Sequence, residues 1–295
     1  MKWIDYISPS TLDEATNILA DKGEKARILA GGTDLLVHLR AGALQPDLVV
    51  DGKNIPELTE LTYSPDSGLT LGAAVPCYEI YQNSKISKAY PGLIDSASLV
   101  GGIQIQGRAS VGGNLCNSVP SADTIPGLIA HGVICKITGP NGSREVPVEN
   151  FCTAPRKNVL APNELLVSLS FPPPTPGFGA CYIRFIPRNE MDIAVAGAGV
   201  SVVLKNDTIE SARISLASVA PTPLLVEEAG EALAGKSVND TSALAKAAQI
   251  AKEASSPIND MRGTIEYRKH LCDVLTRRAL NTAIARAKGG VVNAH

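Results

Sequence analysis

Apolar and polar positions alternate at helical spacing near the amino terminus and then give way to a short apolar run. The spacing predicts a first helix with Ser10 as its N-cap, Asp13 as the reciprocal cap and Gly23 just past its end. The apolar run over residues 26–30 predicts a strand. A helix followed by a strand is the pattern of an α/β lobe.

A glycine pair follows this strand. Gly31 and Gly32 make a turn, after which Thr33 would cap a helix that continues to about Arg40. A strand, a glycine turn and a helix in this order direct unpaired backbone N–H groups toward one point. The segment is therefore a candidate anion-binding loop.

A second glycine pair lies in ASVGGNLCNSVPSADTIP, residues 109–126, where Asp123 is the only charged residue. Asn114, Ser118 and Ser121 add neutral hydrogen-bonding groups, so an anion would be held mainly by backbone N–H donors. A tight strand-to-helix turn without a ligand explains this segment equally well. The two pairs lie about 80 residues apart and would close together on an extended anion such as a pyrophosphate.

The glycine spacing excludes two common nucleotide-binding motifs. The chain has no G-x-G-x-x-G at the start of a βαβ unit and no G-x-x-x-x-G-K-[ST] phosphate loop. The sequence therefore supports neither a dinucleotide of the Rossmann type nor a nucleoside triphosphate.

Shorter elements continue to a proline-rich stop near residue 174. A strand and a helix are predicted over residues 68–80, and a helix from residue 90 ends at Gly101 and Gly102. Thr124 would cap another short helix, which the strand over residues 133–139 follows. The stretch FPPPTPGFG indicates a linker.

Beyond the linker, the pattern changes to long strands and then to helices. Residues 192–204 and 208–220 predict an antiparallel pair joined by the turn KND. Three helices are predicted to begin near Thr222, Thr241 and Thr264. The last has a basic face, which we interpret as solvated or facing a partner because the whole chain is slightly acidic.

Composition narrows the function classes. The 295 residues are 44% hydrophobic and 19% charged with a formal net charge of −2, so nucleic acid is not an expected partner. No apolar leader and no membrane-length apolar stretch is present, and we expect a cytoplasmic location. The six cysteines and four histidines are dispersed, which predicts neither a metal centre nor a catalytic triad in this chain.

Seven segments in order resemble the FAD-binding medium subunit of the molybdenum hydroxylases, the family of xanthine dehydrogenase and aerobic carbon monoxide dehydrogenase. They are DYISPSTLDEA, ILAGGTDLL, ASVGGNLCNSVPSADTIP, NELLVSLSFP, RNEMDIAVAGAGV, APTPLLVEEAGEAL and DMRGTIEYRKHLCDVLTRRAL. The resemblance covers nearly the whole chain. The cysteine-bearing insertion that marks hydroxybenzoyl-CoA-reducing relatives does not follow the second glycine segment.

The resemblance implies an α+β fold in two domains. A PCMH-type FAD-binding domain, also called the vanillyl-alcohol-oxidase type, is expected over residues 1–174 in two α/β lobes, about 1–56 and 57–174. A smaller αβ domain with an antiparallel sheet and helices, like the carbon monoxide dehydrogenase flavoprotein C-terminal domain, is expected over residues 178–288, with a tail at 289–295.

The resemblance also implies how FAD is held. The first glycine segment would bind the pyrophosphate through backbone amides, the second would cover it, and Asp123 would contact the adenosine half. Arg27 would add charge, and Ile193 would cover the isoalloxazine ring. The expected FAD-binding residues are Arg27, Ile28, Leu29, Ala30, Gly31, Gly32, Thr33, Asp34, Leu35, Val100, Gly101, Ser110, Val111, Gly112, Gly113, Asn114, Asp123, Leu166, Arg184 and Ile193. Neither glycine segment offers a His or Cys placed for flavin tethering, so the FAD is expected to be noncovalent.

The function implied is that of an electron-transfer subunit. Electrons would come from an iron–sulfur small subunit and pass to an external acceptor, while a large subunit would carry the molybdopterin, in a heterotrimer or a dimer of heterotrimers. No side chain of this chain is expected to act as a catalytic acid or base. Two alternatives remain: a stand-alone flavin oxidase of the vanillyl-alcohol-oxidase type, and a nucleotide-binding scaffold subunit without catalysis.

Overall fold

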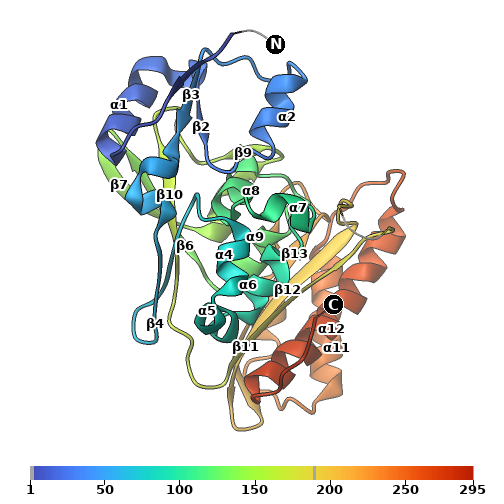
Figure 1. Cartoon of the computed structure of the whole chain (residues 1–295). Coiled ribbons are helices and arrows are strands. Elements are labelled where there is room, and N and C mark those ends of the chain that lie inside the picture. The colour runs from blue at the N-terminus through green and yellow to red at the C-terminus, as the bar shows by residue number, and fades with distance from the viewer. Residues whose placement is uncertain (1–2, 189–190, 295) are drawn as a thin grey trace.

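A small parallel sheet forms the first lobe of the chain (Figure 1). The computed structural model describes residues 3–188 and 191–294. The strands are β1 (Asp5–Ile7), β2 (Ala26–Leu29) and β3 (Leu48–Asp51), in the order β1-β3-β2. Helix α1 (Leu12–Lys22) follows β1, and α2 (Leu35–Arg40) follows β2. The predicted strand–glycine–helix order is therefore present in the first lobe.

The second lobe is a five-stranded antiparallel sheet with short helices, in the order β4-β5-β10-β6-β7. Its strands are β4 (Leu61–Ser64), β5 (Gly68–Gly72), β6 (Ile134–Gly139), β7 (Gly142–Pro147) and β10 (Leu165–Phe171). Its helices are α3 (Pro56–Thr59), α4 (Cys77–Gln82), α5 (Ser84–Ala89), α6 (Pro91–Ala97), α7 (Ile103–Gln106), α8 (Val111–Asn117) and α9 (Thr124–Ala130). A separate small hairpin pairs β8 (Cys152–Ala154) with β9 (Lys157–Asn158).

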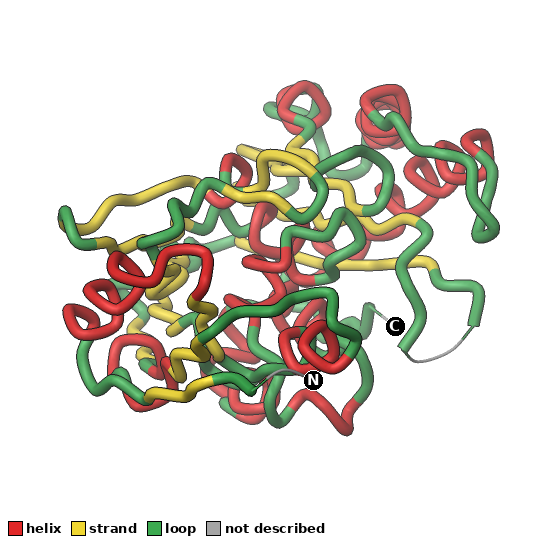
Figure 2. The backbone as a smooth tube through the Cα atoms, turned by 90° about the horizontal axis from the view of Figure 1, so that it is seen from above, coloured by secondary structure: helices red, strands yellow, loops and turns green. Residues whose placement is uncertain are grey.

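Four antiparallel strands and three helices form the C-terminal part. The strands are β11 (Phe178–Phe185), β12 (Ala196–Lys205), β13 (Thr208–Ala217) and β14 (Leu224–Leu225), paired in that order. The helices are α10 (Glu227–Glu231), α11 (Thr241–Ala254) and α12 (Ile265–Ala287). In the view from above, helices lie on both sides of the long strands (Figure 2).

The C-terminal sheet packs against helices of the second lobe and so connects the C-terminal part to the rest of the chain. Helix α12 packs on β11 and β12, while α6 and α9 of the second lobe also contact this sheet. Ser201 Oγ donates to Ala130 O at 2.6 Å, and Ser215 Oγ donates to Pro126 O at 2.7 Å. Arg213 Nε donates to Ile129 O at 2.9 Å. Side chains of the C-terminal part thus donate hydrogen bonds to three backbone carbonyl groups of α9 and fix this helix against the sheet.

Two predicted caps are shifted by one residue. Thr11, not Ser10, is the N-cap of α1, and its side chain accepts from the N–H of Glu14. Glu14 in turn accepts from the N–H of Ser10, so Glu14 and not Asp13 closes the reciprocal arrangement. The chain offers adjacent hydroxyl and acidic residues here, and spacing alone does not choose between them.

Several other predicted boundaries move. Thr124 lies inside α9, where Asp123 is the N-cap residue. The helix predicted to reach Gly101 ends at Ala97. In the C-terminal part, α10 begins only at Glu227, whereas α11 begins at Thr241 as predicted, with Asp240 as its N-cap.

Thr264 caps α12, as predicted. The predicted antiparallel pair is also confirmed, with β12 and β13 joined at the expected turn. Strand β11 was not predicted because it follows directly on the proline-rich stretch that we interpreted as a linker.

His131 is buried, and we expect it to make the stability of the protein depend on pH. Nδ1–H of His131 donates to Gly127 O at 2.7 Å, and the ring packs against Tyr90, Phe171 and Phe178. Burial lowers the pKa of His131 to about 4, from 6.5. Between pH 4 and pH 6.5, the unfolded chain therefore binds more protons than the folded chain. The contribution of neutral His131 to the free energy of unfolding is complete above pH 6.5 and is lost as the pH falls toward 4. We expect a loss of about 2 kcal/mol between pH 7 and pH 5 from this residue.

Urea unfolding at pH 7 and pH 5 tests this expectation, with His131→Asn as the comparison because it cannot take up the proton. The comparison is needed because burial raises the pKa of Asp123 to about 6, from 3.8, and that group acts with the opposite sign. The expected result is a smaller loss of stability at low pH in the variant than in the wild type. Equal losses in the two proteins would show that His131 does not control the acid response.

Candidate functional site

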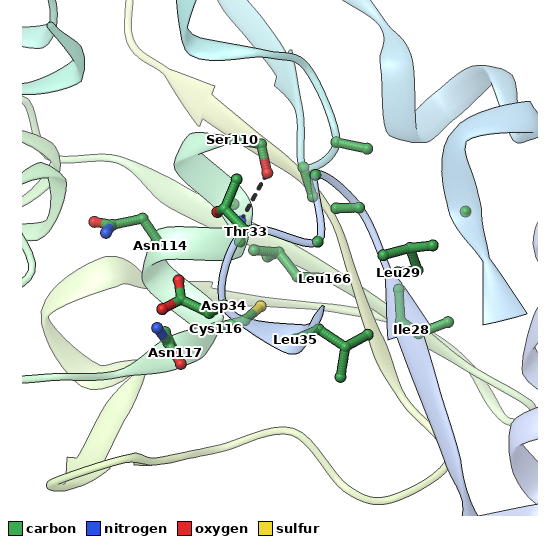
Figure 3. A pocket seen from close by; sticks show the side chains of 18 of the residues that line it. Ile28, Leu29, Thr33, Asp34, Leu35, Ser110, Asn114, Cys116, Asn117 and Leu166 are labelled. Carbon is green, nitrogen blue, oxygen red and sulfur yellow. Dashed lines mark hydrogen bonds between the residues drawn. The ribbon is translucent and has the colours of Figure 1, made fainter. Parts of the chain in front are cut away.

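A cavity of about 500 Å³ lies between the first and second lobes (Figure 3). Its wall on one side is the chain from the end of β2 into α2, residues 27–35. The opposite wall comes from α8 and from the region around Leu165 and Leu166 at the start of β10. The size is within the range of pockets that hold small organic ligands.

Close packing of two backbone segments explains two of the four glycines. A Cβ on Gly31 would lie 1.8 Å from the carbonyl oxygen of Arg108, just before α8. A Cβ on Gly112 would lie 2.5 Å from the backbone of Ala73. The two glycine segments are therefore brought to the same cavity by direct backbone contact, which only residues without a side chain allow.

The other two glycines have different roles. Gly32 has φ +79°, a conformation that L side chains rarely adopt, and its Cβ would also meet Leu29 at 2.7 Å. Gly113 has neither constraint: a Cβ there would meet only Ser110 Oγ, at 3.0 Å. Gly113 lines the cavity, so a side chain at this position would enter the space of a ligand.

The second glycine segment is not a strand-to-helix turn. Gly112 and Gly113 lie in the first turn of α8, and the preceding element is the short helix α7. Ser110 is the N-cap and its Oγ accepts from the N–H of Gly113 at 3.1 Å, the dashed line in Figure 3. Apolar residues before a glycine pair do not distinguish a strand from a helix end.

Unpaired backbone donors line both walls. Among the described residues, the N–H groups of Thr33, Asp34 and Leu35 on one wall and of Gly112 on the other make no hydrogen bond to protein. The prediction that Thr33 is the N-cap of α2 is wrong. Asp34 occupies that position, and its side chain makes no capping hydrogen bond. Neutral N–H donors from two directions suit an anion such as a diphosphate.

Most of the expected FAD-binding residues line this cavity. They are residues 27–35, Val100, Ser110, Gly112, Gly113, Asn114 and Leu166. Asn114 also supports the wall, because its Oδ1 accepts from Thr124 Oγ1 at 2.6 Å. The cavity wall does not include Gly101, Val111, Asp123, Arg184 or Ile193.

Asp123 and Arg184 lie together instead in a buried ion pair outside this cavity. Arg184 Nη1 donates to Asp123 Oδ2, and Tyr182 donates its hydroxyl to Asp123 Oδ1 at 3.0 Å. Both carboxylate oxygens therefore have protein partners. The contact of Asp123 with the adenosine half stays an untested prediction. Ile193 is 47% exposed.

Several cavity residues were not predicted. His38 and Leu44 come from α2 and the loop after it, and Asn117 comes from the last turn of α8. Asn117 lies within the second glycine segment, so its hydrogen-bonding side chain could have been predicted from the sequence to line the site. Arg156 of the small hairpin also lines the cavity, and no sequence motif marked it.

The family match agrees with this geometry. Residues 2–174 match the family described as "FAD binding domain in molybdopterin dehydrogenase", and residues 182–283 match "CO dehydrogenase flavoprotein C-terminal domain". The chain belongs to this family of FAD-binding subunits. The family resemblance and the two-domain α+β fold expected from the sequence are confirmed.

Individual relatives are similar over their full length. The chain is 31% identical to the xanthine dehydrogenase FAD-binding subunit of Escherichia coli O157:H7, over 96% of this chain and 97% of that protein. It is also 31% identical to the carbon monoxide dehydrogenase medium chain of Afipia carboxidovorans, over 96% and 98% of the two chains.

Among solved structures, a chain of carbon monoxide dehydrogenase from Hydrogenophaga pseudoflava matches with a TM-score of 0.91 and 30% identity, covering 97% of this chain and 98% of that one. In the part of the chain that the structure describes, no helix has the length and apolarity needed to cross a membrane.

Proposed function

We propose that this family member is the FAD-carrying electron-transfer subunit of a multi-subunit molybdenum hydroxylase. The observation that carries the proposal is the cavity in which two glycine segments meet with unpaired N–H donors. An extended dinucleotide with a central diphosphate matches these donors. Supplied with FAD, the site would gain a group that exchanges electrons one or two at a time.

The residues of the chain bind and orient this group. Thr33, Asp34 and Leu35 offer N–H donors on one wall, and Gly112 offers one on the other. Apolar side chains such as Leu166 also line the wall and offer contact surface to the flavin ring. These roles need no catalytic acid or base in this chain.

Partner chains are part of the proposal. The relatives are themselves described as a subunit of xanthine dehydrogenase and a medium chain of carbon monoxide dehydrogenase. We infer an iron–sulfur small subunit as electron donor and a molybdopterin-binding large subunit, in a heterotrimer or a dimer of heterotrimers in the cytoplasm. The domain limits we propose are 1–174 and 178–288 with a tail at 289–295, which the matched ranges 2–174 and 182–283 support.

Noncovalent FAD is the first testable consequence. The purified chain should show a flavin spectrum, and acid precipitation should leave FAD in the supernatant, because backbone hydrogen bonds to a diphosphate do not survive unfolding. Mass spectrometry of the supernatant identifies the flavin. Flavin in the pellet would indicate a covalent link, and FMN alone would remove the argument from the diphosphate.

The electron-transfer role is tested with the same spectrum. Mixing the isolated chain with candidate aromatic, purine or aldehyde substrates should leave its flavin absorbance unchanged. The complex assembled with its iron–sulfur and molybdenum subunits should lose that absorbance with its own substrate. Loss of absorbance in the isolated chain would contradict the role and favour a stand-alone oxidase, while a purified chain without flavin would favour a scaffold.

A further inference from the structure

The small β8–β9 hairpin carries an arginine in a strained turn. Ala154 pairs with Lys157, so Pro155 and Arg156 form a two-residue turn between the strands. Proline sets the first position, and Arg156 has φ +61° at the second, the combination of a type II turn. Glycine is the residue that fits this second position without strain. Folding of the hairpin therefore does not explain an arginine here.

The hairpin is tied to the helix that carries the second glycine segment. The N–H of Arg156 donates to Ser118 O at 2.8 Å, and Asn158 Nδ2 donates to Cys116 O at 2.9 Å. Helix α8 has seven residues and is about 10 Å long. Arg156 is thus held at the last turn of α8 and lines the same cavity as the first turn, where Gly112 and Gly113 lie.

The other charged groups of the cavity wall are mostly engaged. Arg27 Nη1 donates to Glu24 O at 2.7 Å and to Ala26 O at 2.8 Å, carbonyl groups of its own segment. Glu164 forms a two-point ion pair with Arg144, at 2.8 and 2.7 Å. By contrast, the guanidinium of Arg156 makes no hydrogen bond or ion pair with any described residue.

An anionic ligand needs such a cation because the wall also carries a carboxylate. Asp34 comes shortly after the first glycine pair and lines the cavity (Figure 3). A diphosphate bound to the N–H donors of this segment meets that like charge, which backbone dipoles alone do not neutralise. Guanidinium groups pair with phosphate oxygens through two parallel hydrogen bonds.

We propose that Arg156 pairs with the diphosphate of the adenosine diphosphate half of FAD and supplies a guanidinium group from outside the two glycine segments. The inference rests on the proposed FAD site. It assigns the specificity for a dinucleotide over a flavin without phosphate to a residue outside both glycine segments. The proposal also explains why arginine and not glycine occupies the strained position of the turn, because glycine would remove the positive charge together with the strain.

Three variants of the purified chain, stripped of flavin, test the proposal. Arg156→Gly removes the charge and the strain, Arg156→Lys keeps the charge, and Lys157→Gln is the matched control, an exposed cation of the same hairpin that does not line the cavity. Affinities for FAD, ADP and riboflavin are measured by fluorescence and calorimetry at low and high salt, and thermal unfolding without ligand is measured for each variant.

The expected result is a loss of at least tenfold in FAD and ADP affinity for Arg156→Gly, with a weaker salt dependence, unchanged riboflavin affinity and an unfolding temperature equal to or above that of the wild type. Arg156→Lys should fall between the wild type and Arg156→Gly, because it keeps the charge but not the two parallel hydrogen bonds, and Lys157→Gln should match the wild type. Wild-type affinity for FAD and ADP in Arg156→Gly would overturn the proposal, as would an equal loss in Lys157→Gln. A wild-type chain that binds neither FAD nor ADP would instead overturn the proposed function.

Discussion

Arg286→Met is expected to lower the free energy of unfolding by about 3–5 kcal/mol, because it leaves a buried carboxylate without its counter-charge. Arg286 on α12 donates to both oxygens of Asp95 on α6, at 2.6 and 2.9 Å, and to Ala180 O at 2.7 Å. Both side chains of the pair are at most 10% exposed. Urea unfolding of the wild type and the variant measures the difference.

The same helix supplies a matched control. Arg277 and Asp273 form an exposed i, i+4 pair on α12 at 2.9 Å, and Arg277→Met should change stability by less than about 0.5 kcal/mol. Adding Asp95→Asn to Arg286→Met should recover part of the loss, because the unpaired charge is then absent. A loss below about 1 kcal/mol in Arg286→Met alone would show that water reaches Asp95.

Gly31→Ala and Gly113→Asp should both abolish FAD retention, but with opposite effects on the fold. A Cβ at Gly31 would lie 1.8 Å from Arg108 O, so the two walls of the cavity must separate, and we expect a stability loss of about 1–3 kcal/mol. At Gly113 a Cβ meets only the Ser110 hydroxyl, at 3.0 Å, and the added carboxylate lies in the first turn of α8, where acidic residues are favourable to a helix. There it would repel a diphosphate without disturbing the protein.

Flavin content after gel filtration and urea unfolding together measure the two effects. Gly32→Asp is a poorer test, because the positive φ of Gly32 and its contact with Leu29 would destabilise the chain whether or not a ligand binds. Stoichiometric FAD in Gly113→Asp would mean that the diphosphate does not approach α8. An unchanged unfolding curve for Gly31→Ala would mean that the two walls adjust to the methyl group.

The sequence predicted those parts of the fold whose signal is local. The alternation in residues 192–204 and 208–220 predicted β12 and β13 with their turn, and glycine after Lys22 marked the end of α1. Strand β11 was missed because the prolines before it signal a loop, although it pairs with β12, the next strand along the chain. Caps shifted by one residue wherever hydroxyl and acidic residues stood next to each other.

The candidate site was predictable only where a motif or family resemblance reached it. Gly31 and Gly113 were found through their segments, whereas the reason for Gly31, its contact with Arg108, depends on chain segments far apart in sequence. Arg156 carries no local signal, because one arginine after a proline is common in surface turns. The partner of Asp123 likewise could not be predicted from its own segment. The C-terminal part of the chain brings Arg184 into an ion pair with Asp123.

The serine contacts to α9 have a consequence for exchanging parts between relatives. Ser201 and Ser215 donate to the carbonyl oxygens of Ala130 and Pro126 in α9, a helix whose first residue, Thr124, donates to Asn114 in the cavity wall. Stability of the C-terminal sheet is therefore transmitted to the flavin pocket through one short rigid element. A chimera that joins the first 174 residues to the C-terminal domain of a relative would need hydroxyl donors at both serine positions to keep that pocket ordered.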